Sequence, residues 1–167
     1  AQIFIRREQP EEALLYLRRA ASRCPNQVDI LFGLGNCYLE CDNISSAIVT
    51  YRALLEVDQR HTRALFNLGH CYKRLGQWPE SAELFRQALR LDPSFYKARF
   101  MYAHCLSHQG EIKRAVREYR GTIVQSPNYA KAHFNLGNCY VQLDQLDSAE
   151  KAYSRVIELD PSSDRAL

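Results

Sequence analysis

Apolar, small and polar residues follow one another along the chain in a pattern that repeats every 34 residues. In each copy a small residue follows a large apolar one, a cysteine comes two residues later, and another large apolar residue follows the cysteine. The four copies are Leu34-Gly35-Asn36-Cys37-Tyr38, Leu68-Gly69-His70-Cys71-Tyr72, Tyr102-Ala103-His104-Cys105-Leu106 and Leu136-Gly137-Asn138-Cys139-Tyr140. Within residues 130–163 helical spacing occurs twice, first around Leu136 and Tyr140 and then around Ala149 and Tyr153. Each copy therefore predicts a pair of helices, and repetition at this period is typical of a solenoid.

Prolines mark where the second helix of each copy is expected to stop. A proline has no N–H to donate, and it disfavours helical conformation in the residue before it. The prolines at these positions are Pro93, Pro127 and Pro161. The first full copy has Gln59 at the equivalent position, so its second helix is expected to run on or to turn differently.

Four features together resemble the tetratricopeptide repeat family. They are the Leu-Gly pairs, the aromatic residues at fixed offsets, the small residues of the second helix, and the Asp-Pro pairs at which a second helix is expected to stop. The resemblance implies an all-α fold, a right-handed α-solenoid of stacked antiparallel helix hairpins built from 34-residue repeats. We expect one array over residues 1–167. Its parts are a partial repeat at 1–27, full repeats at 28–61, 62–95, 96–129 and 130–163, and the start of a further repeat at 164–167.

Six cysteines raise the question of disulfides, and the repeat argues against them. Cys37, Cys71, Cys105 and Cys139 lie one repeat apart, so they occupy equivalent points on helices whose axes are about 8–10 Å or more apart. A disulfide needs Cα atoms within about 7 Å. We expect these cysteines to be small, buried and reduced, which favours the cytoplasm or another reducing compartment such as the nucleus.

Three histidines have a spacing that could suit a metal. His104 and His108 lie four residues apart on one predicted helix, and His70 occupies the place of His104 one repeat earlier. Such a pair with a third ligand could hold zinc, but no glutamate follows His104 as in the metalloprotease signature. Histidines that face a partner or water are the expected alternative. The sequence also has no phosphate-binding glycine loop and no nucleophile elbow, so it predicts neither an enzyme nor a metal or cofactor site.

The resemblance also implies a concave groove lined by the inner face of each first helix. A phenylalanine recurs there in all four repeats, as repeat consensus or as a ligand contact. Asparagines beside it offer paired donors and acceptors that suit the backbone of an extended peptide. The predicted peptide-binding groove consists of Phe32, Asn36, Arg63, Phe66, Asn67, His70, Lys73, Arg74, Lys97, Phe100, Met101, His104, His108, Lys131, Phe134, Asn135 and Asn138.

Charge is spread unevenly over the repeats, although the net charge of the whole chain is only +3. Counting lysine and arginine against aspartate and glutamate, the net charge is −3 for residues 28–61, +2 for 62–95, +4 for 96–129 and −2 for 130–163. Along the presumed inner face, the three later repeats carry cations and no carboxylate. These cations are Arg63, Lys73, Arg74, Lys97 and Lys131. The pattern favours a partner with acidic residues, attracted by the field and held by apolar contacts.

These observations predict a protein–protein interaction scaffold that binds an extended or helical, acidic peptide segment in its groove as part of a larger assembly. One alternative is a structural or oligomerising segment of a multisubunit complex, because terminal repeats need a polar cap and uncapped ends favour self-association. Nucleic-acid binding through the basic middle repeats is a weaker alternative, because the flanking repeats are acidic. No membrane partner is expected, since the sequence contains no run of about 18 apolar residues.

Overall fold

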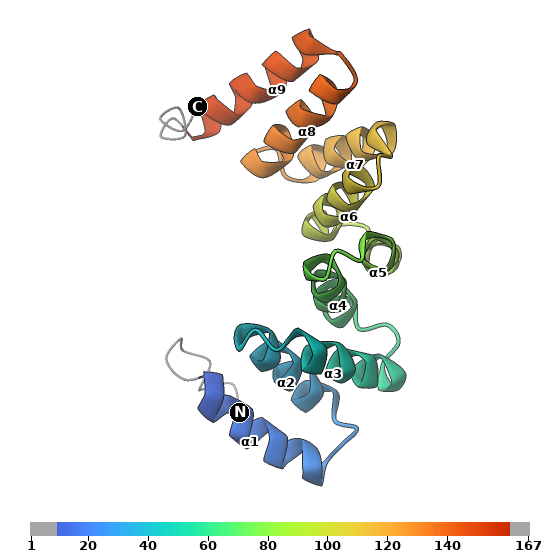
Figure 1. Cartoon of the computed structure of the whole chain (residues 1–167), viewed down its shortest axis with the longest axis vertical. Coiled ribbons are helices and arrows are strands. Elements are labelled where there is room, and N and C mark those ends of the chain that lie inside the picture. Colours follow the sequence, from blue (N-terminus) through green and yellow to red (C-terminus); the bar gives the residue numbers. More distant parts are fainter. Residues whose placement is uncertain (1–9, 161–167) are drawn as a thin grey trace. The chain divides into compact units, whose positions relative to one another are not determined.

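The computed structural model describes residues 10–160. These residues form nine helices that follow one another as sequential hairpins (Figure 1), so the all-α fold of helix hairpins is confirmed. The helices are α1 (Pro10–Arg23), α2 (Val28–Glu40), α3 (Ile44–Val57), α4 (Thr62–Arg74), α5 (Trp78–Leu91), α6 (Tyr96–His108), α7 (Ile112–Gln125), α8 (Ala130–Gln142) and α9 (Leu146–Leu159). In this described part, no helix has the length and apolar character that crossing a membrane requires.

The chain divides into two units. The first ends at Gly76 and contains α1 to α4, and the second begins at Gln77 and contains α5 to α9. In the first unit α2 packs against α1, α3 and α4; in the second, α6 packs against α5, α7 and α8, and α8 also packs against α7 and α9. The single array over residues 1–167 stays a prediction, and the start of a further repeat at 164–167 lies outside the described residues.

The turn after each first helix contains one residue with a left-handed backbone. After α2 and α4 this residue is Asp42 (φ 59°) and Gly76 (φ 72°), respectively. After α6 and α8 it is Gly110 (φ 78°) and Asp144 (φ 57°). Glycine adopts this conformation without strain, and aspartate is one of the few other residues that tolerate it. Because the four positions are equivalent in the repeat, each first helix ends at the same place.

The second helix of the first full repeat ends where the others do, so the expectation that Gln59 would let it run on or turn differently is wrong. Helix α3 ends at Val57, which is one repeat before the end of α5 at Leu91. Asp58 then leaves the helix with φ −130° and ψ 89°, and Asp92 has nearly the same values. Each of these carboxylates accepts a hydrogen bond of 3.0 Å from the backbone N–H two residues later. An aspartate turn therefore follows α3 at the same place even though this repeat lacks the proline.

A glycine in the first helix and a tyrosine in the second allow the two helices of a hairpin to pack closely. A Cβ atom added at Gly35 in α2 would lie 2.6 Å from the ring of Tyr51 in α3. One added at Gly137 in α8 would meet the ring of Tyr153 in α9 at a similarly short distance. The tyrosine ring therefore occupies the space that any other side chain would need.

The repeated cysteines are free and buried, as the sequence predicts. Cys37, Cys71, Cys105 and Cys139 are all buried free thiols, whereas Cys24 is exposed. Burial raises the pKa of Cys71 to about 11, and it also raises the pKa of Cys37 and of Cys139. The thiolate form, which is the reactive one, is therefore suppressed at these three positions.

We expect iodoacetamide to alkylate Cys24 in the native chain much faster than Cys71. The reason is that Cys71 is both inaccessible and held as a thiol by its raised pKa. Mass spectrometry of peptides from timed reactions measures each site. Rapid labelling of Cys71 in the folded protein would contradict its burial between the helices.

Candidate peptide-binding faces

All residues of the predicted groove lie on first helices, and they divide between the two units. Those on α2 and α4 form what we call the first-unit face: Phe32, Asn36, Arg63, Phe66, Asn67, His70, Lys73 and Arg74. Those on α6 and α8 form the second-unit face: Lys97, Phe100, Met101, His104, His108, Lys131, Phe134, Asn135 and Asn138.

The first-unit face contains a hydrogen-bonded group of two asparagines and a tyrosine. The hydroxyl of Tyr51 donates to Oδ1 of Asn36 at 2.6 Å. Nδ2 of Asn67 donates to the same Oδ1 at 2.8 Å and lies 3.1 Å from the Tyr51 hydroxyl oxygen. These bonds orient both amides and leave Nδ2 of Asn36 and Oδ1 of Asn67 as the groups that could meet a peptide backbone. The sequence suggested the asparagines but not their link through the buried tyrosine.

Of the three cations on the first-unit face, one is already paired. Arg74 forms an ion pair with Asp42, which lies in the turn after α2. Arg63 is exposed and Lys73 is half-buried. Sequence reasoning missed the pairing of Arg74, because Asp42 lies one repeat earlier and off the first helix. The positive charge offered to a partner here is therefore smaller than the sequence predicts.

His70 is held neutral by its surroundings. Its ring meets the ring of Phe66 edge-on at a centroid distance of 4.6 Å. Burial disfavours the charged imidazolium, and the positive charge of Lys73 adds to this, so the pKa of His70 falls to about 4 from an ordinary 6.5. At neutral pH this residue therefore contributes no charge to the face.

We expect acid to destabilise the chain through His70. Because its folded-state pKa lies below its ordinary value, His70 stabilises the fold fully above pH 6.5, and this contribution is lost as the pH falls toward 4. The loss is ~2 kcal/mol, allowing for solvent around a half-buried ring. Urea unfolding of wild type and His70→Asn at several pH values measures it; asparagine is a suitable replacement because Asn36 and Asn138 occupy the equivalent position. Equal pH dependence of the two chains would contradict the prediction.

The second-unit face is positive and has no carboxylate on its helices. Neither α6 nor α8 contains an aspartate or a glutamate. Lys97 and Lys131 are equivalent in the repeat and both are exposed. Within residues 10–160 their side chains make no ion pair or hydrogen bond. Arg99, the other lysine or arginine on α6 and α8, is instead paired with Glu118 of α7 at 3.0 Å.

Two repeated phenylalanines of this unit have different environments. Phe100 is 4% exposed and packs against Tyr119 and Tyr129, with ring centroids 5.6 and 5.1 Å apart. Phe100 therefore belongs to the core and does not form the surface of a groove. Phe134 contacts only Tyr153 among the described aromatic rings, at 5.9 Å, and is 45% exposed. It is the phenylalanine of this face that a ligand could reach.

The two asparagines of the second-unit face are oriented by neighbouring groups. Asn138 accepts a hydrogen bond of 2.7 Å from the hydroxyl of Tyr153, which repeats the pairing seen in the first unit. Nδ2 of Asn135 donates to the backbone carbonyl of Lys131 at 2.8 Å. Each amide keeps further hydrogen-bonding capacity for a partner.

The two histidines of α6 form an aromatic cluster with a tryptophan. The ring centroids of His104 and His108 lie 4.6 Å apart. Trp78 of α5 stacks on His108 with a centroid distance of 3.9 Å and an angle of 2° between the rings. Among residues 10–160, no group of three or more His, Cys, Asp or Glu side chains is placed to hold a metal ion. The sequence did not single out Trp78, although its position at the start of α5 brings it to the end of α6.

The repeat pattern and the helix hairpins agree with comparisons to known proteins. Models of the tetratricopeptide repeat match residues 4–68, 62–95, 84–117 and 130–163. No curated protein matched the chain. Similar solved structures include a MamA protein, with 18% identity, a TM-score of 0.87 and coverage of 96% of this chain and 99% of that one. MamA from Desulfovibrio magneticus RS-1 has 21% identity, a TM-score of 0.89 and coverage of 96% and 90%.

A third similar structure is YrrB, which is described as a TPR protein with an unusual peptide-binding site. It has 21% identity and a TM-score of 0.82, and the match covers 92% of this chain and 79% of YrrB. At such identities the likeness shows the fold alone. On the repeat matches and the helix hairpins, the chain belongs to the tetratricopeptide repeat family.

Proposed function

We propose that the chain is a protein-interaction scaffold whose second-unit face binds an acidic peptide segment. Tetratricopeptide repeat proteins are typically scaffolds for protein–protein interaction, and the similar YrrB structure is described as having a peptide-binding site. The observation that carries the proposal is the combination of exposed Lys97 and Lys131 with helices that contain no carboxylate. Such a face attracts acidic segments and repels basic ones.

Charge alone would not hold a peptide on this face. An exposed ion pair contributes about 0.2–1 kcal/mol, so two lysines steer and orient a partner rather than supply most of the affinity. The exposed ring of Phe134 offers an apolar anchor close to Lys131 on α8. Asn135 and Asn138 can add hydrogen bonds to a peptide backbone. A fitting partner segment therefore combines acidic residues with at least one apolar side chain.

The first-unit face supports the same function with a different balance of forces. Its free amide groups on Asn36 and Asn67 are fixed by the bonds to Tyr51, so binding them costs little side-chain entropy. Its charge is weaker, because Asp42 pairs with Arg74 and His70 is neutral at pH 7. This face is suited to recognise backbone rather than acidic side chains.

Changing Lys97 and Lys131 together to glutamate should weaken partner binding about tenfold or more, because two attractions become repulsions. Affinity capture with the whole chain as bait, followed by quantitative mass spectrometry, identifies which proteins depend on these lysines. The affinity of an acidic segment from such a protein is then measured by fluorescence anisotropy.

The matched control carries Lys113→Glu and Arg117→Glu, which change the net charge by the same amount on exposed positions of α7. It should bind like wild type, and circular dichroism should show that both variants are folded. Equal loss in both variants would mean that only net charge matters and that the face is not the site. Unchanged capture by the variant with Lys97 and Lys131 reversed would also refute the proposed face.

A further inference from the structure

A groove with a volume of about 410 Å³ lies between α7 and α9, with α8 beneath it. The buried side chain of Leu136 and the ring of Tyr140 come from α8, and Ile123 comes from α7. Val124 at its rim is 81% exposed, the largest exposure among the large apolar residues described in residues 10–160. The groove therefore presents an apolar surface to solvent.

This groove is separate from the second-unit face. Successive residues of an α-helix are about 100° apart around its axis. On that spacing Lys131, Phe134 and Asn138 lie on one side of α8, whereas Leu136 and Tyr140 lie on the opposite side. A ligand in the groove would therefore not contact the lysines and asparagines of the second-unit face.

Cationic side chains line the groove, and two of them have no partner within residues 10–160. Arg120 comes from α7 and Lys151 from α9; both are exposed, and neither makes an ion pair or hydrogen bond in the described part of the chain. Arg155 also lines the groove but is paired with Glu158 at 2.6 Å. No carboxylate is among the described residues that line it. The groove is thus apolar at its base and positive at its edges.

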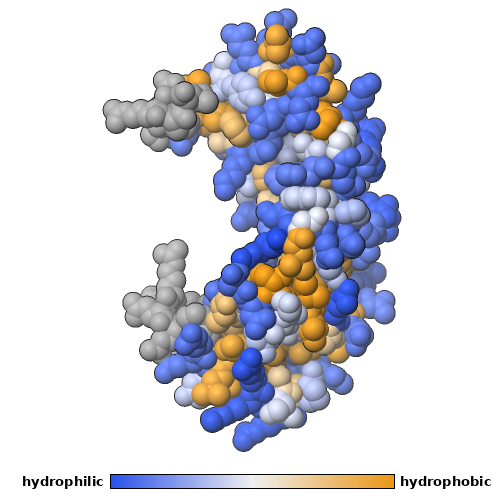
Figure 2. All heavy atoms as spheres, in the orientation of Figure 1, coloured by the Kyte–Doolittle hydropathy of each residue, from blue (hydrophilic) through white to orange (hydrophobic). Residues whose placement is uncertain are grey.

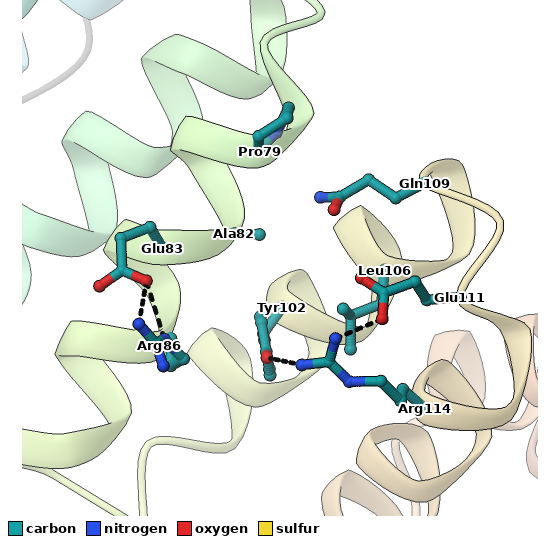
Figure 3. A pocket seen from close by; sticks show the side chains of 9 residues that line it. All are labelled: Pro79, Ala82, Glu83, Arg86, Tyr102, Leu106, Gln109, Glu111 and Arg114. Carbon is teal, nitrogen blue, oxygen red and sulfur yellow. Dashed lines mark hydrogen bonds and ion pairs between the residues drawn. The ribbon is translucent and has the colours of Figure 1, made fainter.

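The equivalent groove one repeat earlier is smaller, and its charged side chains pair within the chain. It lies between α5 and α7 and has a volume of about 200 Å³. Arg114 of α7 donates to the hydroxyl of Tyr102 in α6 at 2.9 Å and forms an ion pair with Glu111, as Figure 3 shows. Arg86 is paired with Glu83, with Nε and Oε2 2.8 Å apart. Every charge at this earlier groove is therefore satisfied within the chain.

The residues that pair with one another in the earlier groove are replaced in the later one. At the equivalent positions one repeat later, Leu136 replaces Tyr102, Ser148 replaces Arg114 and Gln145 replaces Glu111. The arginine, its carboxylate and its hydroxyl acceptor are all absent from the later groove. The groove between α7 and α9 is correspondingly larger and lacks this polar network.

Arginines equivalent to Arg120 are occupied in the first unit. Arg18 of α1 donates to the hydroxyl of Tyr38 at 3.0 Å and lies 5.3 Å from its ring centroid. The guanidinium carbon of Arg52 in α3 likewise lies 5.7 Å from the ring centroid of Tyr72. Arg120 and Tyr140 are the equivalent pair in the later groove, but the described structure shows no bond between them. The guanidinium of Arg120 is therefore available to another group.

We infer that this groove, defined by Arg120, Ile123, Leu136, Tyr140 and Lys151, is a second binding site for an acidic peptide segment with an apolar side chain. The apolar side chain packs on Leu136 and Tyr140, and carboxylates on either side of it pair with Arg120 and Lys151. Charge complementarity selects this occupant, because both unpaired groups at the edge are cations. The site shares no residue with the second-unit face and does not depend on it.

The test is a site-resolved titration of the ¹⁵N-labelled whole chain by NMR, with the peptide acetyl-EELFDD-amide as the probe. Amide signals of Ile123, Val124 and Lys151 should shift in a saturable manner. The neutral peptide acetyl-QQLFNN-amide should bind these positions about tenfold more weakly, because it lacks the charge pairing. Absence of saturable shifts at the groove residues would overturn the inference.

Three variants distinguish binding in this groove from binding elsewhere on the chain. Arg120→Glu with Lys151→Glu should remove the groove shifts. Gln145→Glu with Ser148→Arg introduces the arginine–glutamate pair of the earlier groove without changing net charge, and because the arginine side chain fills space beside Leu136, it should also remove them. Lys97→Glu with Lys131→Glu reverses two charges on the opposite side and should leave the groove shifts intact, even if binding at the second-unit face is lost. Groove shifts that survive the changes at Gln145 and Ser148, or that vanish only when Lys97 and Lys131 are reversed, would overturn the inference.

Discussion

Replacing Tyr119 with alanine should lower the free energy of unfolding by about 4 kcal/mol. Tyr119 is 1% exposed, and its ring lies 5.6 Å from that of Phe100, so its removal leaves a large cavity inside the second unit. In a repeat protein such a cavity weakens both the hairpin and its contact with the neighbouring helix. Urea unfolding followed by circular dichroism measures the change.

Tyr119→Phe is the matched control, and it should cost little. Phenylalanine already occupies the equivalent position at Phe85, where it is fully buried. Burial raises the pKa of Tyr119, as expected for a hydroxyl that stays protonated in apolar surroundings. If alanine and phenylalanine at this position were equally tolerated, the ring would not be part of the core.

Replacing Gly35 with alanine should destabilise the first unit by about 2–3 kcal/mol. The new methyl group would lie 2.6 Å from the ring of Tyr51 and would have to displace it. The displacement would also disturb the bonds from Tyr51 and Asn67 to Asn36. We therefore expect both a lower unfolding midpoint and altered side-chain amide signals of the two asparagines.

Gly33→Ala provides the control for this change in the same helix. An added Cβ there would meet only the side chain of Leu17, at an ordinary 3.4 Å. Since alanine is favoured over glycine in a helix by about 1 kcal/mol, this substitution should be neutral or stabilising. Equal destabilisation by both substitutions would show that the helices do not pack tightly at Gly35.

The helices and their ends could largely be predicted from the sequence, because each repeat provides an independent copy of the same signal. The small residue at Gly35 and the large one at Tyr51 recur at fixed distances, and packing of one against the other follows from their sizes. The end of α3 does not follow from the proline pattern, because Asp58 caps this helix and its carboxylate accepts a turn hydrogen bond in a repeat that lacks the proline.

The candidate site could be predicted only as a set of positions. Periodicity places a residue on a helix face, but it does not predict which partner a long polar side chain binds or how deeply an aromatic ring is buried. The pairing of Arg74 with Asp42 and the burial of Phe100 under Tyr129 therefore came only from the structure.

The visible surfaces of the two units differ in hydropathy. In Figure 2, hydrophobic residues gather over part of the first unit, whereas the second unit is mostly hydrophilic in this view.

The groove between α7 and α9 could not be found from the repeat pattern, because it arises where the pattern is broken. Ser148 and Gln145 carry no signal in the sequence by themselves, because the groove depends on their difference from Arg114 and Glu111, which pair in the earlier groove.

Binding of an acidic peptide by the first helices of the second unit is tested most directly by the amide signals of the second-unit face. With acetyl-EELFDD-amide as the probe, signals of Lys97, Lys131 and Asn135 should shift in a saturable manner at low salt. Binding there should weaken several-fold between about 0.05 M and about 0.3 M salt, because exposed charges are screened. Reversal of Lys97 and Lys131 should abolish these shifts. Absence of shifts on this face at low salt, or equal binding to the reversed variant, would contradict the claim.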